Sequence, residues 1–316
     1  MPDATILIGD VRERLAELPD GSVQACITSP PYWGLRDYGH DGQIGLEQTP
    51  DAYVAEMVAV FREVRRVLAD DGTCWVNLGD SYATGGMSNP SSSSTLNGGK
   101  DRGAATYSIV RKRPDGLKPK DLVGIPWRVA FALQADGWWL RQDIIWAKPN
   151  PMPESVTDRC TKAHEYLFLL TKSARYYYDN EPIREDVKAG SGSMAAQAHD
   201  GGRGDKTVDP RSLRVERVYD VIKGANRRSV WTIATKPYAG AHFAVMPEAL
   251  VEPCVLAGSR EGDTILDPFT GSGTVGVVAL KHGRNFVGTE LNPEYAALAE
   301  ARIRDDGPLF NEVRSA

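Results

Sequence analysis

The chain has 316 residues, of which 41% are hydrophobic and 25% charged, and its formal net charge is -5. A chain of this size and composition can bury a large core, as one elaborated domain or two, so a soluble globular protein is expected. The N-terminus lacks a basic stretch followed by an apolar segment, and no run of about eighteen apolar residues occurs. Secretion and membrane spanning are therefore unsupported, and a cytoplasmic protein is expected.

Cysteine spacing and charge distribution narrow the function further. Cys26, Cys74, Cys160 and Cys254 are far apart and form no Cys-x-x-Cys pair, so neither a disulfide framework nor a zinc site is expected. Residues 100–236 hold 25 Lys and Arg against 17 Asp and Glu, whereas the remainder is acidic. A basic middle segment fits a nucleic-acid surface, but an ordinary solvated surface gives the same pattern, so motifs must decide.

The first part of the chain alternates strands and helices. Apolar periodicity predicts strands at 4–9, 23–28 and 73–78, and helices at 11–18 and 51–69. The strand at 23–28 ends at Ser29-Pro30-Pro31, because proline cannot continue a hydrogen-bonded ladder. Residues 84–106 are rich in Gly, Ser and Asn and are predicted to form a mobile loop.

The second part interrupts this alternation and then restores it. The predicted order is a helix at 122–135, a strand at 138–146, a proline-broken turn at 147–153, a hairpin with arms 166–172 and 175–179, and an irregular insert at 180–228. A strand at 230–233, helix 247–257, strand 264–267, helix 274–282, strand 285–290 and helix 293–304 follow. This order predicts an α/β fold with a doubly wound, mostly parallel sheet, whose ligands bind at the carboxyl ends of strands. The expected units are 1–179, 180–228 and 229–316.

A glycine-rich turn between the last two β-α units is the most informative motif. It reads Asp267-Pro-Phe-Thr-Gly-Ser-Gly-Thr274, and Glu290 ends the next strand. Gly271 and Gly273 allow a tight turn and close approach of the backbone to a ligand. Asp267 can bind a ligand ammonium, and Glu290 can accept hydrogen bonds from both ribose hydroxyls. No Gly-Lys-[Ser/Thr] sequence supplies a phosphate-clamping lysine, so a phosphate-free adenosyl ligand is favoured over ATP.

A second motif, Ser29-Pro30-Pro31-Tyr32, ends the strand at 23–28 in a rigid turn. As a functional site, the Ser29 hydroxyl and the Pro30 carbonyl would accept hydrogen bonds from the exocyclic amine of a flipped base, on which Tyr32 would stack. The alternative is a turn that merely ends a strand, and the tetrapeptide alone does not decide. Asp10, after the first strand, could contact an adenine or cap the following helix, and the two roles are compatible.

Together these motifs resemble those of the amino-methylating DNA methyltransferases of the permuted β group, in which the catalytic tetrapeptide precedes the cofactor motif. The resemblance covers nearly the whole chain. It implies a circularly permuted methyltransferase fold, S-adenosylmethionine as cofactor, double-stranded DNA as substrate, and a target-recognition role for residues 180–228. A cognate restriction endonuclease is a possible partner, and the chain could be a monomer or a homodimer.

The resemblance also implies the site residues. Ser29, Pro30, Pro31 and Tyr32 form the expected catalytic set. The expected cofactor-binding set is Asp10, His242, Phe243, Asp267, Phe269, Gly271, Ser272, Gly273, Thr274 and Glu290. His242 would open a segment at the methionine end of the cofactor, although a turn histidine is the simpler interpretation. Lys148, Arg227 and Arg228 are expected to bind DNA, and no metal is expected.

Ser29 stands where adenine-N6 enzymes of the family usually carry Asp or Asn, so the resemblance favours cytosine N4 as the target. Adenine N6 is the alternative, because a hydroxyl and a carboxylate can both orient an amine. An RNA or protein-amide methyltransferase and a non-catalytic binding module are further alternatives. A cytosine-C5 enzyme would need a nucleophilic cysteine after a proline, and the one candidate, Cys254, lies in an apolar helical run.

Overall fold

The structure is a computed structural model and describes residues 2–34, 39–40, 42–83, 116–186, 224–235, 245–307 and 312–315. The predicted loop at 84–106, most of the predicted insert (187–223), and the predicted site residues His242 and Phe243 lie outside these ranges. Within the described ranges, no helix is both long enough and apolar enough to cross a membrane.

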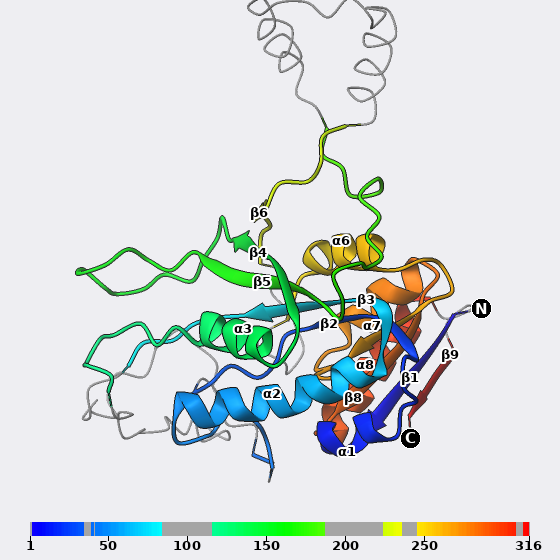
Figure 1. The fold of residues 1–316 in the computed structure, drawn as a ribbon, viewed down its shortest axis with the longest axis horizontal. Coiled ribbons are helices and arrows are strands. Elements are labelled where there is room, and N and C mark those ends of the chain that lie inside the picture. Colours follow the sequence, from blue (N-terminus) through cyan, green and yellow to red (C-terminus); the bar gives the residue numbers. More distant parts are fainter. Residues whose placement is uncertain are drawn as a thin grey trace, which may run out of the picture.

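Strands and helices alternate along the described residues (Figure 1). The strands are β1 (Asp3–Ile8), β2 (Val23–Thr28), β3 (Leu68–Leu78), β4 (Trp139–Ala147), β5 (His164–Thr171), β6 (Val230–Thr232), β7 (Thr264–Asp267), β8 (Asn285–Glu290) and β9 (Glu312–Ser315). The helices are α1 (Val11–Ala16), α2 (Pro50–Val67), α3 (Ile125–Ala135), α6 (Glu248–Gly258), α7 (Thr274–Lys281) and α8 (Pro293–Asp306). Side-chain caps start three of them, since Asp10, Thr49 and Asn292 accept backbone N–H bonds at α1, α2 and α8.

These strands form one sheet in the order β6-β4-β5-β3-β2-β7-β8-β1-β9. Every neighbouring pair is parallel except the two pairs that β5 makes with β3 and β4. The predicted doubly wound, mostly parallel sheet is therefore confirmed. The central strands β2 and β7 come from opposite ends of the sequence, and their pairing joins the two β-α-β regions.

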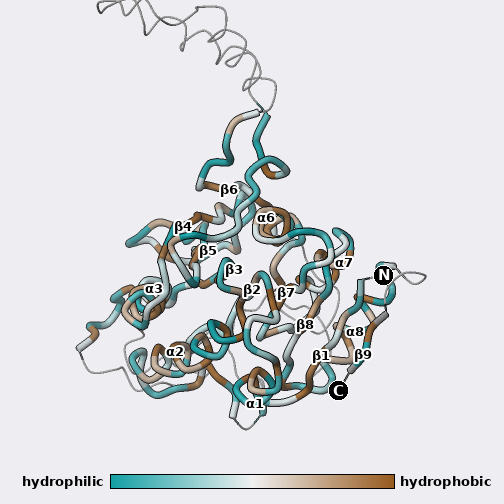
Figure 2. The backbone as a smooth tube through the Cα atoms, turned by 45° about the vertical axis from the view of Figure 1, so that its right-hand side comes forward, coloured by the Kyte–Doolittle hydropathy of each residue, from teal (hydrophilic) through white to brown (hydrophobic). Residues whose placement is uncertain are grey.

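The sheet separates two hydrophobic cores, because successive side chains of a strand point to opposite faces. On β2, Ala25 and Ile27 belong to one core and Cys26 to the other. The first core contains the apolar residues of α6, α7 and α8, and the second contains those of α1, α2 and α3. Helices thus cover both faces, and in Figure 2 helices such as α2 and α3 carry both hydrophilic and hydrophobic stretches.

The hairpin predicted from 166–172 and 175–179 is wrong. β5 is paired with β4 on one edge and with β3 on the other, so neither edge is left for residues 175–179. The tyrosines of this segment pack as side chains without forming a strand; Tyr178, for example, stacks on Trp75 with ring centroids 6.3 Å apart. Aromatic residues favour strands because their side chains pack well on a half-buried surface. In this segment the same kind of packing is made by side chains of an irregular backbone.

Two helix or strand starts also differ from the prediction, and one strand was not predicted. α3 begins at Ile125 instead of 122, because Gly124 adopts a left-handed conformation (φ 77°) and proline occupies the first turn. β3 begins at Leu68, directly where α2 ends. β9 was not predicted, since its four residues, Glu-Val-Arg-Ser, show no apolar run, but it pairs in parallel with β1 at the edge of the sheet.

Candidate active site

A pocket lies at the carboxyl ends of four parallel strands, where ligands bind in open α/β sheets. Residues that follow or end β1, β2, β7 and β8 line it. From the predicted sets these are Asp10, Ser29, Pro30, Pro31, Tyr32, Asp267, Phe269, Gly271, Ser272, Thr274 and Glu290. The fold therefore brings the two motifs, more than 230 residues apart in sequence, to one cavity.

Asp267 is the last residue of β7 and is only 2% exposed. Its Oδ1 accepts hydrogen bonds from the Thr28 hydroxyl at 2.7 Å and from the Phe269 N–H at 3.0 Å. Burial raises the pKa of this carboxyl to about 7, and the nearby Glu290 carboxylate adds to the rise. A buried acid of this kind gains most from a cationic ligand, because the cation offsets the cost of burying its charge.

The glycine turn gives each of its two glycines a different task. Gly271 has a positive φ of 52° and donates its N–H to Glu290 Oε2 at 2.8 Å. Gly273 has a φ of 76°, and a Cβ there would lie 2.9 Å from the Cβ of Ala299 on α8. Gly271 therefore fits the predicted turn beside a ligand, whereas Gly273 makes room for a helix and is not among the residues that line the pocket.

Arg302 of α8 also contacts this turn, a role that no motif of the sequence indicates. Its Nη1 donates to the Ser272 carbonyl at 3.2 Å and to the Thr274 hydroxyl at 2.8 Å. An arginine in the last turns of an amphipathic helix carries no sequence signal of such a role. The contact appears only when α8 packs beside the start of α7.

Glu290 ends β8 with its carboxylate at the pocket. Its Oε1 accepts the Asn292 N–H at 3.0 Å, while Oε2 accepts the Gly271 N–H. Burial raises the pKa of this carboxyl, although these backbone hydrogen bonds oppose the rise. Each oxygen keeps a further lone pair, so the group can accept hydrogen bonds from a ligand diol.

Asp10 caps α1, as one of its two predicted roles requires. Its Oδ1 accepts the Arg12 N–H at 2.8 Å, and the Arg12 guanidinium binds both carboxylate oxygens. Hydrogen bonds from Arg12 hold the pKa of Asp10 below its usual range. The side chain also borders the pocket, so the predicted adenine contact is compatible with the cap.

The Ser-Pro-Pro-Tyr turn is fixed by its neighbours. The Tyr53 hydroxyl of α2 donates to the Pro31 carbonyl at 2.9 Å. The Tyr32 ring lies against Gly79, where an added Cβ would be only 2.6 Å from the ring carbon Cε2. Ser29 and Pro30 line the same pocket as Asp267. A base held by this turn would therefore lie next to a ligand bound by Asp267.

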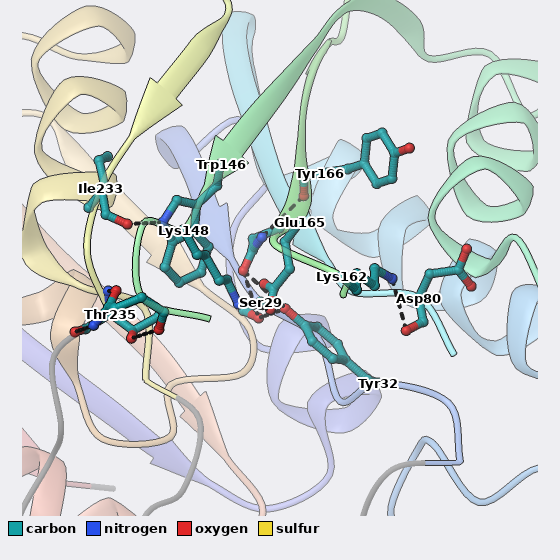
Figure 3. Close-up of polar contacts among 12 residues, drawn as sticks. Ser29, Tyr32, Asp80, Trp146, Lys148, Lys162, Glu165, Tyr166, Ile233 and Thr235 are labelled. Atoms are coloured by element: carbon teal, nitrogen blue, oxygen red, sulfur yellow. Dashed lines mark hydrogen bonds and ion pairs between the residues drawn. The ribbon is translucent and has the colours of Figure 1, made fainter. Parts of the chain in front are cut away.

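A polar cluster surrounds the Tyr32 hydroxyl (Figure 3). The Tyr32 hydroxyl donates to Glu165 Oε2 at 2.7 Å and lies 3.1 Å from Asn77 Oδ1. Lys148 Nζ forms an ion pair with Glu165 Oε1. Burial, with the Glu165 charge next, raises the pKa of Tyr32 well above its ordinary value, so the phenol stays protonated. Sequence reasoning missed Asn77 and Glu165, although a glutamate at the start of an apolar strand was a usable signal.

The three basic residues expected to bind DNA have different surroundings. Lys148 has a side chain only 17% exposed, and its Nζ lies 4.2 Å from the centre of the Trp146 ring. Arg227 stacks on Trp231 at 4.5 Å. The Arg228 side chain is 81% exposed and pairs with Glu185 at 2.7 Å. Arg228 is therefore the most accessible of the three to a phosphate backbone.

Cys254 lies in α6 and is 1% exposed, and burial raises the pKa of its thiol. A nucleophilic cysteine requires an accessible thiolate, which this setting disfavours. The expectation that Cys254 has no catalytic role is thus supported by its position in the core.

Comparison with known proteins agrees with this geometry. Residues 23–301 match a family model described as DNA methylase, for N6 and N4 methyltransferases. The chain is 49% identical over 315 residues to the Type II methyltransferase M.Cfr9I of Citrobacter freundii, covering 99% of this chain and 91% of the relative.

Two solved structures share the fold. TTHA0409 of Thermus thermophilus, solved in complex with S-adenosyl-L-methionine, has a TM-score of 0.58 at 24% identity and covers 98% of this chain and 99% of its own. The PvuII DNA methyltransferase, described as cytosine-N4-specific, has a TM-score of 0.60 at 19% identity and covers 96% and 90%. With a family model across most of its length and a close relative over nearly all of it, the chain belongs to the family of amino-methylating N6/N4 DNA methyltransferases.

Proposed function

We propose that this protein is a site-specific DNA methyltransferase that moves a methyl group from S-adenosylmethionine to N4 of a flipped cytosine. One observation carries the proposal: the buried Asp267, the partly buried Glu290 and the Ser29–Tyr32 turn line a single pocket. The family supports methyl transfer to an exocyclic amine of DNA, and the close Type II relative supports sequence-specific action.

The residues of the pocket fit S-adenosylmethionine. Asp267 is a buried carboxyl with a pKa of about 7, suited to the ammonium of the methionine part. Glu290 would hold the ribose hydroxyls, Asp10 would approach the adenine, and Phe269 would cover part of the ligand. His242 and Phe243, outside the described residues, are expected to complete the methionine end. When bound, the cofactor supplies an electrophilic methyl group on a sulfonium.

The Ser-Pro-Pro-Tyr turn would prepare the amine. An aromatic amine is a weak nucleophile because its lone pair is delocalised into the ring. The Ser29 oxygen and the Pro30 carbonyl would accept its N–H bonds, which favours a tetrahedral nitrogen, while Tyr32 would stack on the base. Positioning of this kind can supply about 7–11 kcal/mol in favourable cases, so no covalent enzyme intermediate is needed.

Ser29 favours cytosine over adenine as the target, since adenine enzymes of the family usually carry an acidic or amide residue at this place. Adenine N6 remains the second candidate, because the pocket orients an amine and not a particular ring. Double-stranded DNA is the proposed substrate, with Arg228 and the basic segment at 180–228 as its contacts. A cognate restriction endonuclease is proposed as the partner in the cell, by analogy with the Type II relative.

Product analysis tests the proposal directly. Unmethylated plasmid DNA is incubated with the protein and S-adenosylmethionine, digested to nucleosides, and measured by mass spectrometry. N4-methylcytosine is the expected product. N6-methyladenine would establish the second candidate, and 5-methylcytosine or unmodified DNA would overturn the proposal. Ser29→Ala is expected to reduce the yield and leave cofactor affinity unchanged.

A further inference from the structure

The Ser29 hydroxyl has a directional problem that the two motifs alone do not solve. A hydroxyl both donates and accepts hydrogen bonds, and it rotates to suit its neighbours. Only its accepting mode can raise the electron density of an amine. A serine in this position therefore needs a partner that takes its hydrogen and keeps it turned away from the base.

Asn77 is one such partner, because its amide cannot flip freely. Its Nδ2 donates to the Tyr166 carbonyl at 3.1 Å, so Oδ1 is the atom that faces the cluster. This oxygen lies 3.5 Å from Ser29 Oγ and 3.1 Å from Tyr32 Oη. Asn77 is 1% exposed, so water does not compete for this oxygen.

Tyr32 is the second partner, and Glu165 sets its direction. The Tyr32 hydroxyl has two acceptors in reach, Glu165 Oε2 at 2.7 Å and Asn77 Oδ1 at 3.1 Å. The carboxylate bond is shorter and charge-assisted, and such bonds are about twice as strong as neutral ones. The Tyr32 hydrogen therefore goes to Glu165, which leaves the Tyr32 oxygen as an acceptor 3.4 Å from Ser29 Oγ.

Lys148 completes the chain of contacts at the far side of Glu165. Its ammonium, which can only donate, binds Oε1 and offsets the charge of the carboxylate. Both side chains are largely buried, with 17% and 16% exposed, so the pair is protected from solvent screening. The order of contacts is Lys148, Glu165, Tyr32 and Ser29 (Figure 3).

We propose that Glu165, held by Lys148, is a positioning residue that acts through Tyr32, and together with Asn77, to make Ser29 an obligate hydrogen-bond acceptor toward the substrate amine. The inference rests on the proposed function and explains how a neutral serine serves in it. A carboxylate in place of Ser29 would be an acceptor in every orientation. A hydroxyl is an acceptor toward the amine only while its own hydrogen is bonded elsewhere. In this cluster Tyr32 and Asn77 accept that hydrogen.

Glu165→Gln is the decisive variant, because it keeps the shape and reverses the direction. Lys148 still demands an acceptor, so the glutamine oxygen turns to Lys148 and the glutamine NH2 faces Tyr32. The Tyr32 hydrogen then goes to Asn77 Oδ1 or to Ser29 Oγ, and in either case it takes up or removes an acceptor that held the Ser29 hydrogen. The Ser29 hydroxyl is then free to turn its hydrogen toward the base. The single-turnover methylation rate is expected to fall about 10- to 100-fold, by analogy with groups that orient the side chains of metal sites.

The measurement uses the full-length protein in excess over unmethylated plasmid DNA at saturating S-adenosylmethionine, with cofactor affinity measured by calorimetry. Glu63→Gln on α2 is the matched control, since Glu63 also pairs with a basic side chain, Arg66, but does not line the pocket. The control is expected to keep the parental rate. Tyr32→Phe is a second variant, which keeps the ring and removes the link to Glu165, and should cause a similar loss.

A double-mutant cycle separates this role from a merely structural one. If Glu165 acts through Ser29, Glu165→Gln should cost less than about twofold in a Ser29→Ala background, since interacting residues are non-additive. Equal losses in both backgrounds, or a parental rate for Glu165→Gln with wild-type Ser29, would overturn the inference and leave the proposed function intact. A wild-type protein that methylates no DNA amine would overturn both.

Discussion

The carboxylates on the two sides of the pocket have different partners. On the β7 and β8 side, Asp267 and Glu290 accept hydrogen bonds from backbone N–H groups and a threonine hydroxyl, and burial raises both pKa values. On the β2 and β5 side, Glu165 is already paired with Lys148. The first arrangement favours a positively charged ligand, whereas in the second, as proposed above, an internal pair directs hydroxyl groups. Among the described residues, Asp267 and Glu290 on the proposed cofactor side thus have no basic side chain as a hydrogen-bond partner, whereas the proposed orienting side contains an internal ion pair.

The largest effect is expected from a change on the β7 and β8 side of the pocket. Gly271→Val places a β-branched residue at a φ of 52°, in the lining of the pocket and within the turn that donates to Glu290. Cofactor affinity, measured by calorimetry, should fall by more than about 100-fold, since the backbone must approach the ligand here. Gly21→Val is the control, because Gly21 also has a positive φ (64°) but lies in open space. Equal affinity in both variants would refute the assigned pocket.

The next largest effect is expected from a change on the β2 and β5 side of the pocket. Tyr32→Ala removes a stacking surface worth roughly 1–3 kcal/mol per base, together with the hydroxyl that links Ser29 to Glu165. The single-turnover rate should fall severely, while cofactor affinity stays at the parental value. A parental rate would mean that Ser-Pro-Pro-Tyr is only a strand-ending turn. A parallel loss of cofactor affinity would mean that the two sides are not independent.

The raised pKa of Asp267 sharpens the comparison through pH. An ammonium ligand binds the ionised carboxylate, so a proton must leave below pH about 7 before the ion pair forms. Cofactor affinity should therefore rise from pH 5.5 to 7.5, by at most about tenfold per unit. The upper limit stays below the midpoint of the titration of the ligand amine itself, near 7.7–8.0 in model compounds. Asp267→Asn should bind more weakly and with a flatter pH dependence.

The same group gives the ligand-free protein the opposite trend. A carboxyl whose pKa is higher in the folded state contributes stability that is fully present below its unfolded value of 3.8 and is lost as pH rises through about 7. Chemical unfolding without cofactor should therefore show a decline over this window that Asp267→Asn removes. An identical pH profile in both proteins would place the raised pKa elsewhere.

The smallest effect concerns DNA and not the pocket. Arg228→Ala should weaken DNA binding uniformly across sequences and lower the slope of log affinity against log salt by about one, if its exposed guanidinium meets a phosphate. Arg62→Ala is the control, because Arg62 is similarly exposed and paired with Asp136, but lies on α2. An effect limited to the cognate site would indicate base reading in place of phosphate contact.

The sequence was sufficient for the parts of the structure that depend on local patterns. The β-α alternation, the two prolines after β2 and the glycine turn after β7 each follow from short-range chemistry, and the structure places them as expected. The polar cluster was not predicted, because Asn77 and Glu165 lie 88 residues apart and meet only through the pairing of β3 with β5. The false hairpin had the same origin, since only the sheet order reveals that both edges of β5 are occupied.

The pairing of β2 with β7 has a consequence for synthesis of the chain. Ala25 lies opposite Ile265, so the centre of the sheet cannot close until some 240 residues after β2 have been made. At about 5–20 residues per second, that interval is roughly 12–50 s, during which β2 has only β3 as a possible neighbour on the ribosome. The Thr28–Asp267 hydrogen bond, which links the same two strands at the pocket, must wait for the same interval. A nascent chain therefore carries its Ser-Pro-Pro-Tyr turn long before the proposed cofactor site exists, and we expect methylation competence to arise late, when β7 and the residues after it fold against β2.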